Sequence, residues 1–220
     1  MSFETRIIEL TQFSKYGSVY NMPRPAYSEE RVDEIQSEIL KVALDVFRRE
    51  GSAGLTLRAI ATRMGWTPAA LYRYFANKEE LLASIRAYGF VQIAAALREA
   101  RLGAGDPMDA SRRAVRAYLG FAVEEAELFR LMYELDQGDS PSVEHVYVER
   151  ESAFAEARLI AAEAIESGLM QGDANVAAHV LWVGSHGLAA LALAHQLDLG
   201  CSFEEIIEPL IERMTAPLAK

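Results

Sequence analysis

The segment from Leu55 to Lys78 contains several cationic and hydroxyl side chains and no acidic residue. Its cations are Arg58, Arg63, Arg73 and Lys78, and two tyrosines lie among them. Guanidinium, ammonium and hydroxyl groups are the donors that proteins use to bind phosphate oxygens. We therefore expect this segment to face an anion, although a solvated basic surface would show the same composition.

The net charge of the whole chain does not reflect the positive charge of this segment. The 220 residues carry a net charge of −10, which by itself argues against a nucleic-acid partner. Residues 1–86 hold 12 basic and 11 acidic residues, whereas residues 87–220 hold 10 and 21. Because the negative charge lies almost wholly in the second part, the total does not exclude phosphate binding by the first part.

The elements that position the cations are predicted to be helices. Apolar residues recur at three- and four-residue steps, and capping residues precede the periodic stretches. The expected helices cover residues 29–49, 57–64, 68–74 and 78–101, with caps at Ser28, Thr56, Thr67 and Asn77. Gly51 and Gly65 end the first two helices, and Pro68 suits the first position of the third.

The rest of the chain also shows helical periodicity and no strand pattern, so the fold class is all-α. Further helices are expected at about 108–125, 126–136, 142–167, 173–198 and 203–214. The predicted organisation is an N-terminal extension (1–27), a small three-helix unit (28–77) and a larger helical body (78–220). We expect the apolar extension to dock on the protein or on a dimer partner; an arm reaching DNA through Lys15 and Arg24 is the alternative.

The two short helices joined by a glycine-containing turn form the helix-turn-helix arrangement, whose second helix enters the DNA major groove. Arg58 is the best candidate for a bidentate contact to guanine, with a phosphate contact or an internal ion pair as alternatives. One of Tyr72 and Tyr74 is expected to pack internally. The predicted DNA-contacting residues are Thr56, Arg58, Thr67, Pro68, Ala69, Tyr72, Arg73, Tyr74 and Lys78.

Residues 39–82 resemble the DNA-binding domain of the TetR family of transcriptional regulators. The resemblance is carried by residues 43–47, 54–61, 70–75 and 77–82, where the motif Ala70-Leu-Tyr-Arg-Tyr-Phe75 has Tyr74 in place of the His of many members. It implies a dimer that binds a palindromic operator and a C-terminal body that binds a small ligand and changes the spacing of the two units. Residues 128–133 and 182–188 resemble a subgroup marked by a Trp…His-Gly signature.

Aromatic residues at helical spacings in the second part are mostly expected to form core. A subset could line an apolar pocket for an apolar or aromatic effector. The predicted pocket residues are Tyr118, Phe121, Tyr147, Trp182 and His186. A buried, hydrogen-bonded histidine is the more ordinary reading of His186. The wide spacing of His179, His186 and His195 does not suit a metal site, so no metal or cofactor is predicted.

Small residues on the last two long helices, at about 142–167 and 173–198, suit a four-helix dimer interface, or else close packing within one subunit. Gly184, Gly187, Ala189, Ala190 and Ala194 are the residues concerned. No hydrophobic run approaches the roughly 18 residues of a membrane span, so we expect a cytoplasmic protein with no membrane partner.

The predicted function is a ligand-responsive, homodimeric regulator of transcription that binds double-stranded DNA, with repression and release by an effector as the expected mode. The sequence contains no nucleophile motif, phosphate-binding glycine loop or metal-spaced cluster, so an enzyme is not expected. The alternative is a non-catalytic helical protein that binds small molecules or other proteins without binding DNA.

Overall fold

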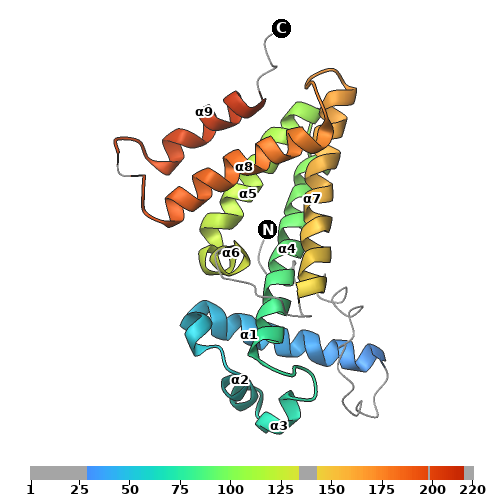
Figure 1. Ribbon diagram of the computed structural model, residues 1–220, viewed down its shortest axis with the longest axis vertical. Helices are drawn as coiled ribbons and strands as arrows, with labels where there is room; N and C mark the ends of the chain where they lie inside the picture. The colour runs from blue at the N-terminus through green and yellow to red at the C-terminus, as the bar shows by residue number, and fades with distance from the viewer. Residues whose placement is uncertain (1–28, 134–142, 198, 216–220) are drawn as a thin grey trace. The chain divides into compact units, whose positions relative to one another are not determined.

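A computed structural model describes residues 29–133, 143–197 and 199–215, and the nine elements found there are all α-helices (Figure 1). They are α1 (Glu29–Gly54), α2 (Leu57–Met64), α3 (Pro68–Leu71), α4 (Lys78–Leu102), α5 (Pro107–Glu124), α6 (Ala126–Tyr133), α7 (Val143–Glu166), α8 (Ala174–Leu193) and α9 (Phe203–Thr215). The all-α class is confirmed. The predicted role of the N-terminal extension concerns residues outside the described part of the chain.

Most helix boundaries agree with the sequence prediction to within a few residues, because local caps set them. Two helices end clearly earlier than expected: α8 was expected to reach residue 198 and ends at Leu193, and α3 was expected to run through Tyr74 and ends at Leu71. A looser helical turn follows, in which the amides of Tyr74 and Phe75 both donate to the carbonyl of Leu71. The side-chain amide of Gln36, on α1, donates to the carbonyl of Tyr74 at 3.2 Å, so packing against α1 determines how this turn ends.

The chain divides into two compact units. Unit 1 comprises residues 1–89 and 131–148, and unit 2 comprises residues 90–130 and 149–220. Helix α4 contributes its first half to unit 1 and its second half to unit 2. The domain boundary predicted at residues 77/78 therefore stays a prediction, since the compact unit that contains α1, α2 and α3 also includes the first three turns of α4.

The core of unit 1 is built from fully buried aliphatic side chains that α1, α2, α3 and α4 all contribute. Examples are Ile39, Leu55, Ile60, Leu71 and Leu81. Each lies on the inner face of its helix or at its entry, so the short helices α2 and α3 are held by tertiary packing. Helices of one or two turns need such support because they are unstable alone in water.

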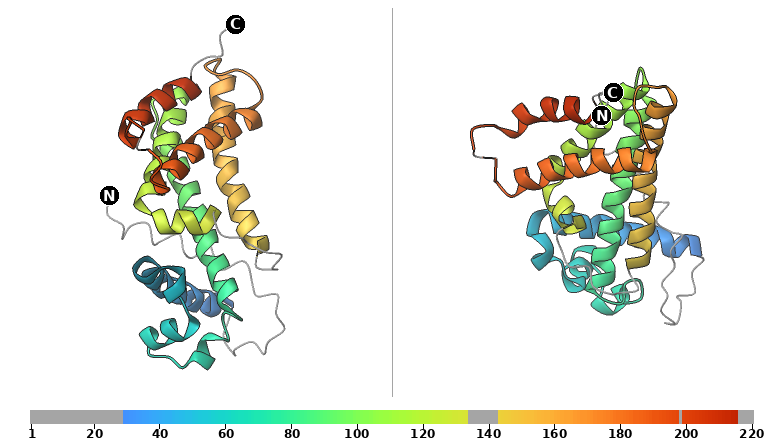
Figure 2. Two further views of the ribbon diagram at one scale, coloured as in Figure 1. Left: turned by 60° about the vertical axis from the view of Figure 1, so that its left-hand side comes forward. Right: turned by 45° about the horizontal axis from the view of Figure 1, so that its top comes forward.

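In unit 2, helices α5, α8 and α9 contact one another, and α9 lies alongside α8 in each view (Figures 1 and 2). Gly184 of α8 faces the side chain of Met214 of α9 so closely that a Cβ atom at residue 184 would overlap the sulfur. Arg116 of α5 forms a bidentate ion pair with Glu208 of α9, with both N···O distances at 2.7 Å. Gly184 therefore serves packing within the subunit, one of the two uses predicted for the small residues.

Helix α8 has an apolar face that the described residues of unit 2 leave exposed. Its exposed residues Val176, Val180, Val183, Gly187 and Leu191 follow one another at three- and four-residue steps. By length and composition, α4 and α8 could each cross a membrane, but 61% of the apolar window of α4 is buried and only 28% of that of α8. The expectation that no helix is long and apolar enough to cross a membrane was wrong for α4 and α8. It counted only uninterrupted apolar residues, whereas α8 qualifies because it contains no Asp, Glu, Lys or Arg.

The end of α8 contains a strained residue. His195 adopts a left-handed conformation with φ of 54°, and the amide of Gln196 donates back to the carbonyl of Leu191. This is the position that glycine usually occupies after a helix, because a side chain makes the left-handed region unfavourable. We predict that His195→Gly raises the free energy of unfolding by about 1 kcal/mol, measured by urea denaturation. An Ala substitution, which keeps the Cβ atom, is the control and should give no gain.

Candidate nucleic-acid interface and a second, aromatic site

The turn between α2 and α3 is fixed by local hydrogen bonds. Thr56 caps α2 by accepting a hydrogen bond from the amide of Ala59 at 3.1 Å. At the other end Gly65 has φ of 69°, its amide donates to the carbonyl of Thr62, and the amide of Trp66 donates to that of Ala61. This paired arrangement ends α2 and directs the chain into α3, and it requires a residue that tolerates the left-handed region.

The next two helices begin with equally local caps. The hydroxyl of Thr67 accepts from the amide of Ala70, and Pro68 occupies the first helical position of α3. Asn77 accepts from the amide of Glu80 at 2.8 Å, and the carboxylate of Glu80 accepts from the amide of Ala76 at 2.6 Å. Burial raises the pKa of the Glu80 carboxyl, and the bond from Ala76 partly counters that rise. The predicted caps at Thr56, Thr67 and Asn77 are confirmed.

The four cations of the acid-free segment have different environments. Arg63 forms ion pairs with Glu50 and Asp45 of α1, and Lys78 donates to the carbonyl of Ser52 near the end of α1. The side chains of Arg58 and Arg73 are exposed and make no ion pair or hydrogen bond to any residue that the structure describes. Two of the four guanidinium or ammonium groups are thus fully available to a ligand.

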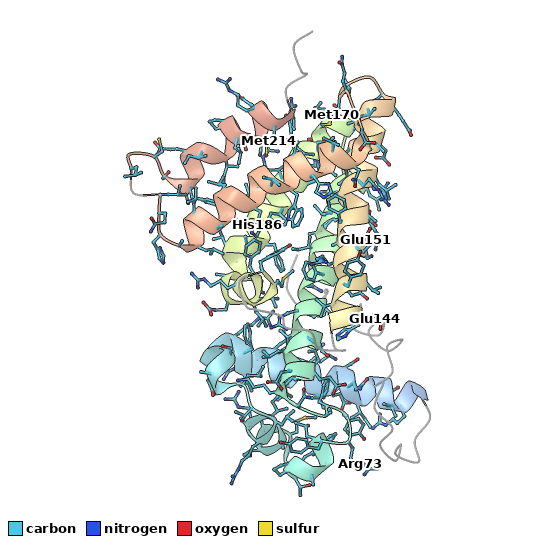
Figure 3. The ribbon with its side chains drawn as sticks, in the orientation of Figure 1. Arg73, Glu144, Glu151, Met170, His186 and Met214 are labelled. Carbon is cyan, nitrogen blue, oxygen red and sulfur yellow. The ribbon has the colours of Figure 1, made fainter. Side chains whose placement is uncertain are left out.

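The predicted contact residues share one exposed surface, with one exception. Thr56, Thr67, Pro68 and Ala69 are exposed, and Tyr72 is 47% exposed. Figure 3 shows Arg73 at the end of α3, on the outside of unit 1.

Tyr74 is only 7% exposed and packs against Trp66, with ring centroids 6.1 Å apart. Of the two tyrosines, Tyr74 is therefore the one that packs internally. Its predicted contact with DNA is corrected, because its ring belongs to the core of unit 1.

In unit 2, three of the predicted pocket residues form a hydrogen-bonded chain. The indole N–H of Trp182 donates to the hydroxyl of Tyr118 at 3.1 Å, and that hydroxyl lies 2.9 Å from Nδ1 of His186. An indole nitrogen can only donate, so the simplest arrangement leaves the tyrosine proton for His186 Nδ1 and the histidine proton on Nε2. Tyr118 is buried and the other two side chains are half-buried. Such polar tips among rings suit an apolar ligand that also carries a polar group.

Two family models match the chain. One, described as bacterial regulatory proteins of the tetR family, matches residues 39–85, and the other, a tetracyclin repressor-like C-terminal domain, matches residues 111–215. Together they span more than half of the sequence and both units. The chain belongs to the TetR family.

The HTH-type transcriptional regulator Rv1816 of Mycobacterium tuberculosis is 30% identical to this TetR-family chain over 148 residues. The match covers 64% of this chain and 60% of the length of that relative. The family and its named members are transcriptional regulators, so the prediction that the protein is not an enzyme is confirmed.

Solved structures show the same fold. A protein of unknown function from Rhodococcus sp. RHA1 superposes with a TM-score of 0.72 at 26% identity, covering 90% of this chain and 97% of that one. A TetR/AcrR-family transcriptional regulator from Thermobifida fusca gives a TM-score of 0.65 at 22% identity, over 85% and 100% of the two chains. The predicted architecture, a helix-turn-helix domain followed by a larger helical domain, is confirmed.

Sequence reasoning missed part of the aromatic cluster of this TetR-family chain. Phe129 of α6 stacks on His186 with centroids 5.4 Å apart, and Phe154 of α7 contacts His179 at 4.4 Å and Trp182 at 6.0 Å. The spacing of residues 179, 182 and 186 along α8 was a usable signal, since it places three rings on one helix face.

The other two predicted pocket residues are less involved. Phe121 is buried one turn beyond Tyr118, and no ring or hydrogen-bond contact joins it to the cluster. Tyr147 is 53% exposed and belongs to unit 1. Its place in the pocket stays a prediction.

We predict that Tyr118→Phe destabilises the protein by about 1–3 kcal/mol, because the Trp182 N–H and His186 Nδ1 would each lose a partly buried partner. Urea denaturation followed by tryptophan fluorescence measures the loss. Tyr72→Phe removes the same atom from a ring that is 47% exposed and should change stability by less than about 0.5 kcal/mol. Equal effects of the two substitutions would contradict this account of the cluster.

Proposed function

We propose that the protein is a dimeric, DNA-binding regulator of transcription that a small-molecule effector releases from a palindromic operator. The observation that carries this proposal is the pair of exposed guanidinium groups, Arg58 and Arg73, beside α3 in a segment without acidic residues. Phosphate neutralisation supplies much of the affinity of a DNA-binding protein, so available cations are the first requirement. The tetR-family match over residues 39–85 covers this surface and supports the same assignment.

The start of α3 would read the bases. Pro68 and Ala69 are exposed there and have no side-chain hydrogen bonds to offer, so they would contact thymine methyl groups. Arg58 is long enough to bind a guanine edge or a phosphate.

The hydroxyls of Thr56 and Thr67 accept hydrogen bonds as caps, which leaves their own protons for phosphate oxygens. Tyr72 and Arg73 would bind the backbone after α3. Lys78 keeps two N–H donors beyond the one it gives to Ser52.

The partner that we propose for the exposed face of α8 is a second copy of the chain. Val183 is 66% exposed, and a Cβ atom at the nearby Gly187 would meet nothing within 4 Å. A stripe of this kind would bury its apolar surface against an identical stripe around a two-fold axis. A two-fold dimer presents two helix-turn-helix units, which matches a palindromic operator with half-sites about one helical turn apart.

The effector site that we propose is the cluster of Tyr118, Phe129, Trp182 and His186. An aromatic or apolar effector would insert among these rings, and a polar group on it would replace one of their hydrogen bonds. Release from DNA follows if the effector binds better to a conformation in which the two α3 helices no longer match successive major grooves. Repression is the simpler mode, because a dimer on the promoter blocks polymerase without needing a further contact surface. The protein would act in the cytoplasm, where the chromosome lies.

The DNA surface makes a first prediction. Arg73→Ala should weaken operator binding about tenfold and lower the slope of log affinity against log salt by about 1 per subunit, since one phosphate contact is lost. Arg58→Ala should also relax the base preference at one operator position if it binds guanine. Fluorescence anisotropy with DNA selected from random sequence measures the affinity, its dependence on salt and the base preference. Arg158→Ala, an exposed arginine of α7 in unit 2, is the matched control and should leave affinity and slope unchanged.

If selection retrieves no DNA, the regulator assignment fails and the alternative of a helical binding protein without DNA affinity is favoured.

The proposed interface makes a second prediction. Val183→Glu introduces a charge into the apolar stripe, so the protein should become monomeric in sedimentation at micromolar concentration and lose operator binding about 100-fold or more. Val123→Glu, at an exposed apolar position of α5 and so on neither of the two helices predicted to form the interface, is the control and should remain a dimer. A dimeric Val183→Glu variant would show that α8 is not the interface.

A further inference from the structure

Arg86 is an unusual residue in unit 1 because its side chain is charged and buried. The residue is only 8% exposed, in the first half of α4. On the same helix face lie Ala83 and Gly89, both buried, and Gly89 packs directly against Met132 at the end of α6. The residues that share this face of α4 with Arg86 are therefore small and apolar.

No carboxylate balances this charge among the residues that the structure describes. Within residues 29–133, 143–197 and 199–215, the one hydrogen bond of the Arg86 side chain runs from Nε to the carbonyl of Leu131 at 3.1 Å. Burial lowers the pKa of Arg86, and no neighbouring charge contributes to the shift. The acidic residues of unit 1 whose side chains the structure describes are either paired elsewhere or exposed: Glu34, Glu38, Asp45, Glu50, Glu79, Glu80 and Glu144.

A purely structural role accounts for only part of this arrangement. Leu131 lies in the last turn of α6, where carbonyls lack helical donors, so Arg86 Nε caps that end. A guanidinium group has five N–H donors, and the cap uses one of them. A neutral donor would satisfy Leu131 without the free-energy cost of burying a cation, so the cap does not explain why the residue is arginine.

We propose that the Arg86 guanidinium binds the carboxylate of a small organic acid. The two terminal nitrogens form a planar fork that matches a carboxylate in bidentate geometry, and an arginine remains charged in an apolar setting. The apolar neighbours Ala83, Gly89 and Met132 select acids with a hydrocarbon skeleton over polar or inorganic anions. The site uses none of the residues of the aromatic cluster and does not depend on DNA binding.

A stability measurement on the protein without ligand separates a binding residue from a structural one. If Arg86 awaits an anion, Arg86→Met removes an uncompensated buried charge and should raise the thermal midpoint by about 2–4 °C. If Arg86 is needed to cap α6, or is balanced by a carboxylate of residues 134–142, the same substitution should lower the midpoint, and the proposal is overturned. Arg98→Met is the control, because it removes a partner of the buried Glu156 and should lower the midpoint.

A ligand measurement then tests the chemistry. Acetate, benzoate and octanoate are added to the full-length protein at millimolar concentration, with benzyl alcohol and octanol as neutral counterparts. We expect benzoate or octanoate to raise the thermal midpoint by several degrees, the alcohols to have no such effect, Arg86→Lys to keep part of the shift and Arg86→Met to abolish it. The proposal fails if none of the carboxylates raises the midpoint, if the alcohols act equally, or if the shift persists in Arg86→Met.

Discussion

The left-handed conformation of Gly65 is the constraint on which the DNA-facing surface depends. It lets two amides turn back onto the last carbonyls of α2, and this fixes the angle at which the chain enters α3. Pro68, Ala69, Tyr72 and Arg73 all follow this turn, so its geometry places them as a group. The buried Leu71 then anchors α3 to the core of unit 1. One turn conformation and one side chain thus hold a helix too short to be stable alone.

Whether a cation of this protein is available to an anion depends on its ion pairs more than on the net charge. Arg63 is neutralised by acids of α1 and Arg98 by Glu156 of α7, whereas Arg58 and Arg73 have no such partner in the described residues. The net charge of −10 comes from the later part of the chain, which would repel DNA and favour approach by unit 1. Arg86 is a further unpaired cation, but it is buried and so is suited to a small anion instead of a phosphate backbone.

The parts of the fold that sequence predicts well are the ones that neighbouring residues determine. Caps at Thr56, Thr67 and Asn77 follow from side-chain oxygens near free amides, and each accepts the hydrogen bond expected of it. The end of α3 and the burial of Tyr74 were not predictable, because both depend on packing against α1 and Trp66. The histidine and tryptophan spacing on α8 indicated a cluster, but its partners come from α5, α6 and α7, and only the fold brings those together.

The threonine caps have a consequence for how this surface can diverge among related proteins. Thr56 and Thr67 hold helix ends with the same hydroxyl groups that face outward, so a change at either residue would alter folding along with any recognition. Ala69 and Tyr72 are exposed and hold no helix end. New base preferences can therefore arise by substitution at these two residues at little cost to the fold, which makes them the natural starting points for altering specificity by evolution or by design.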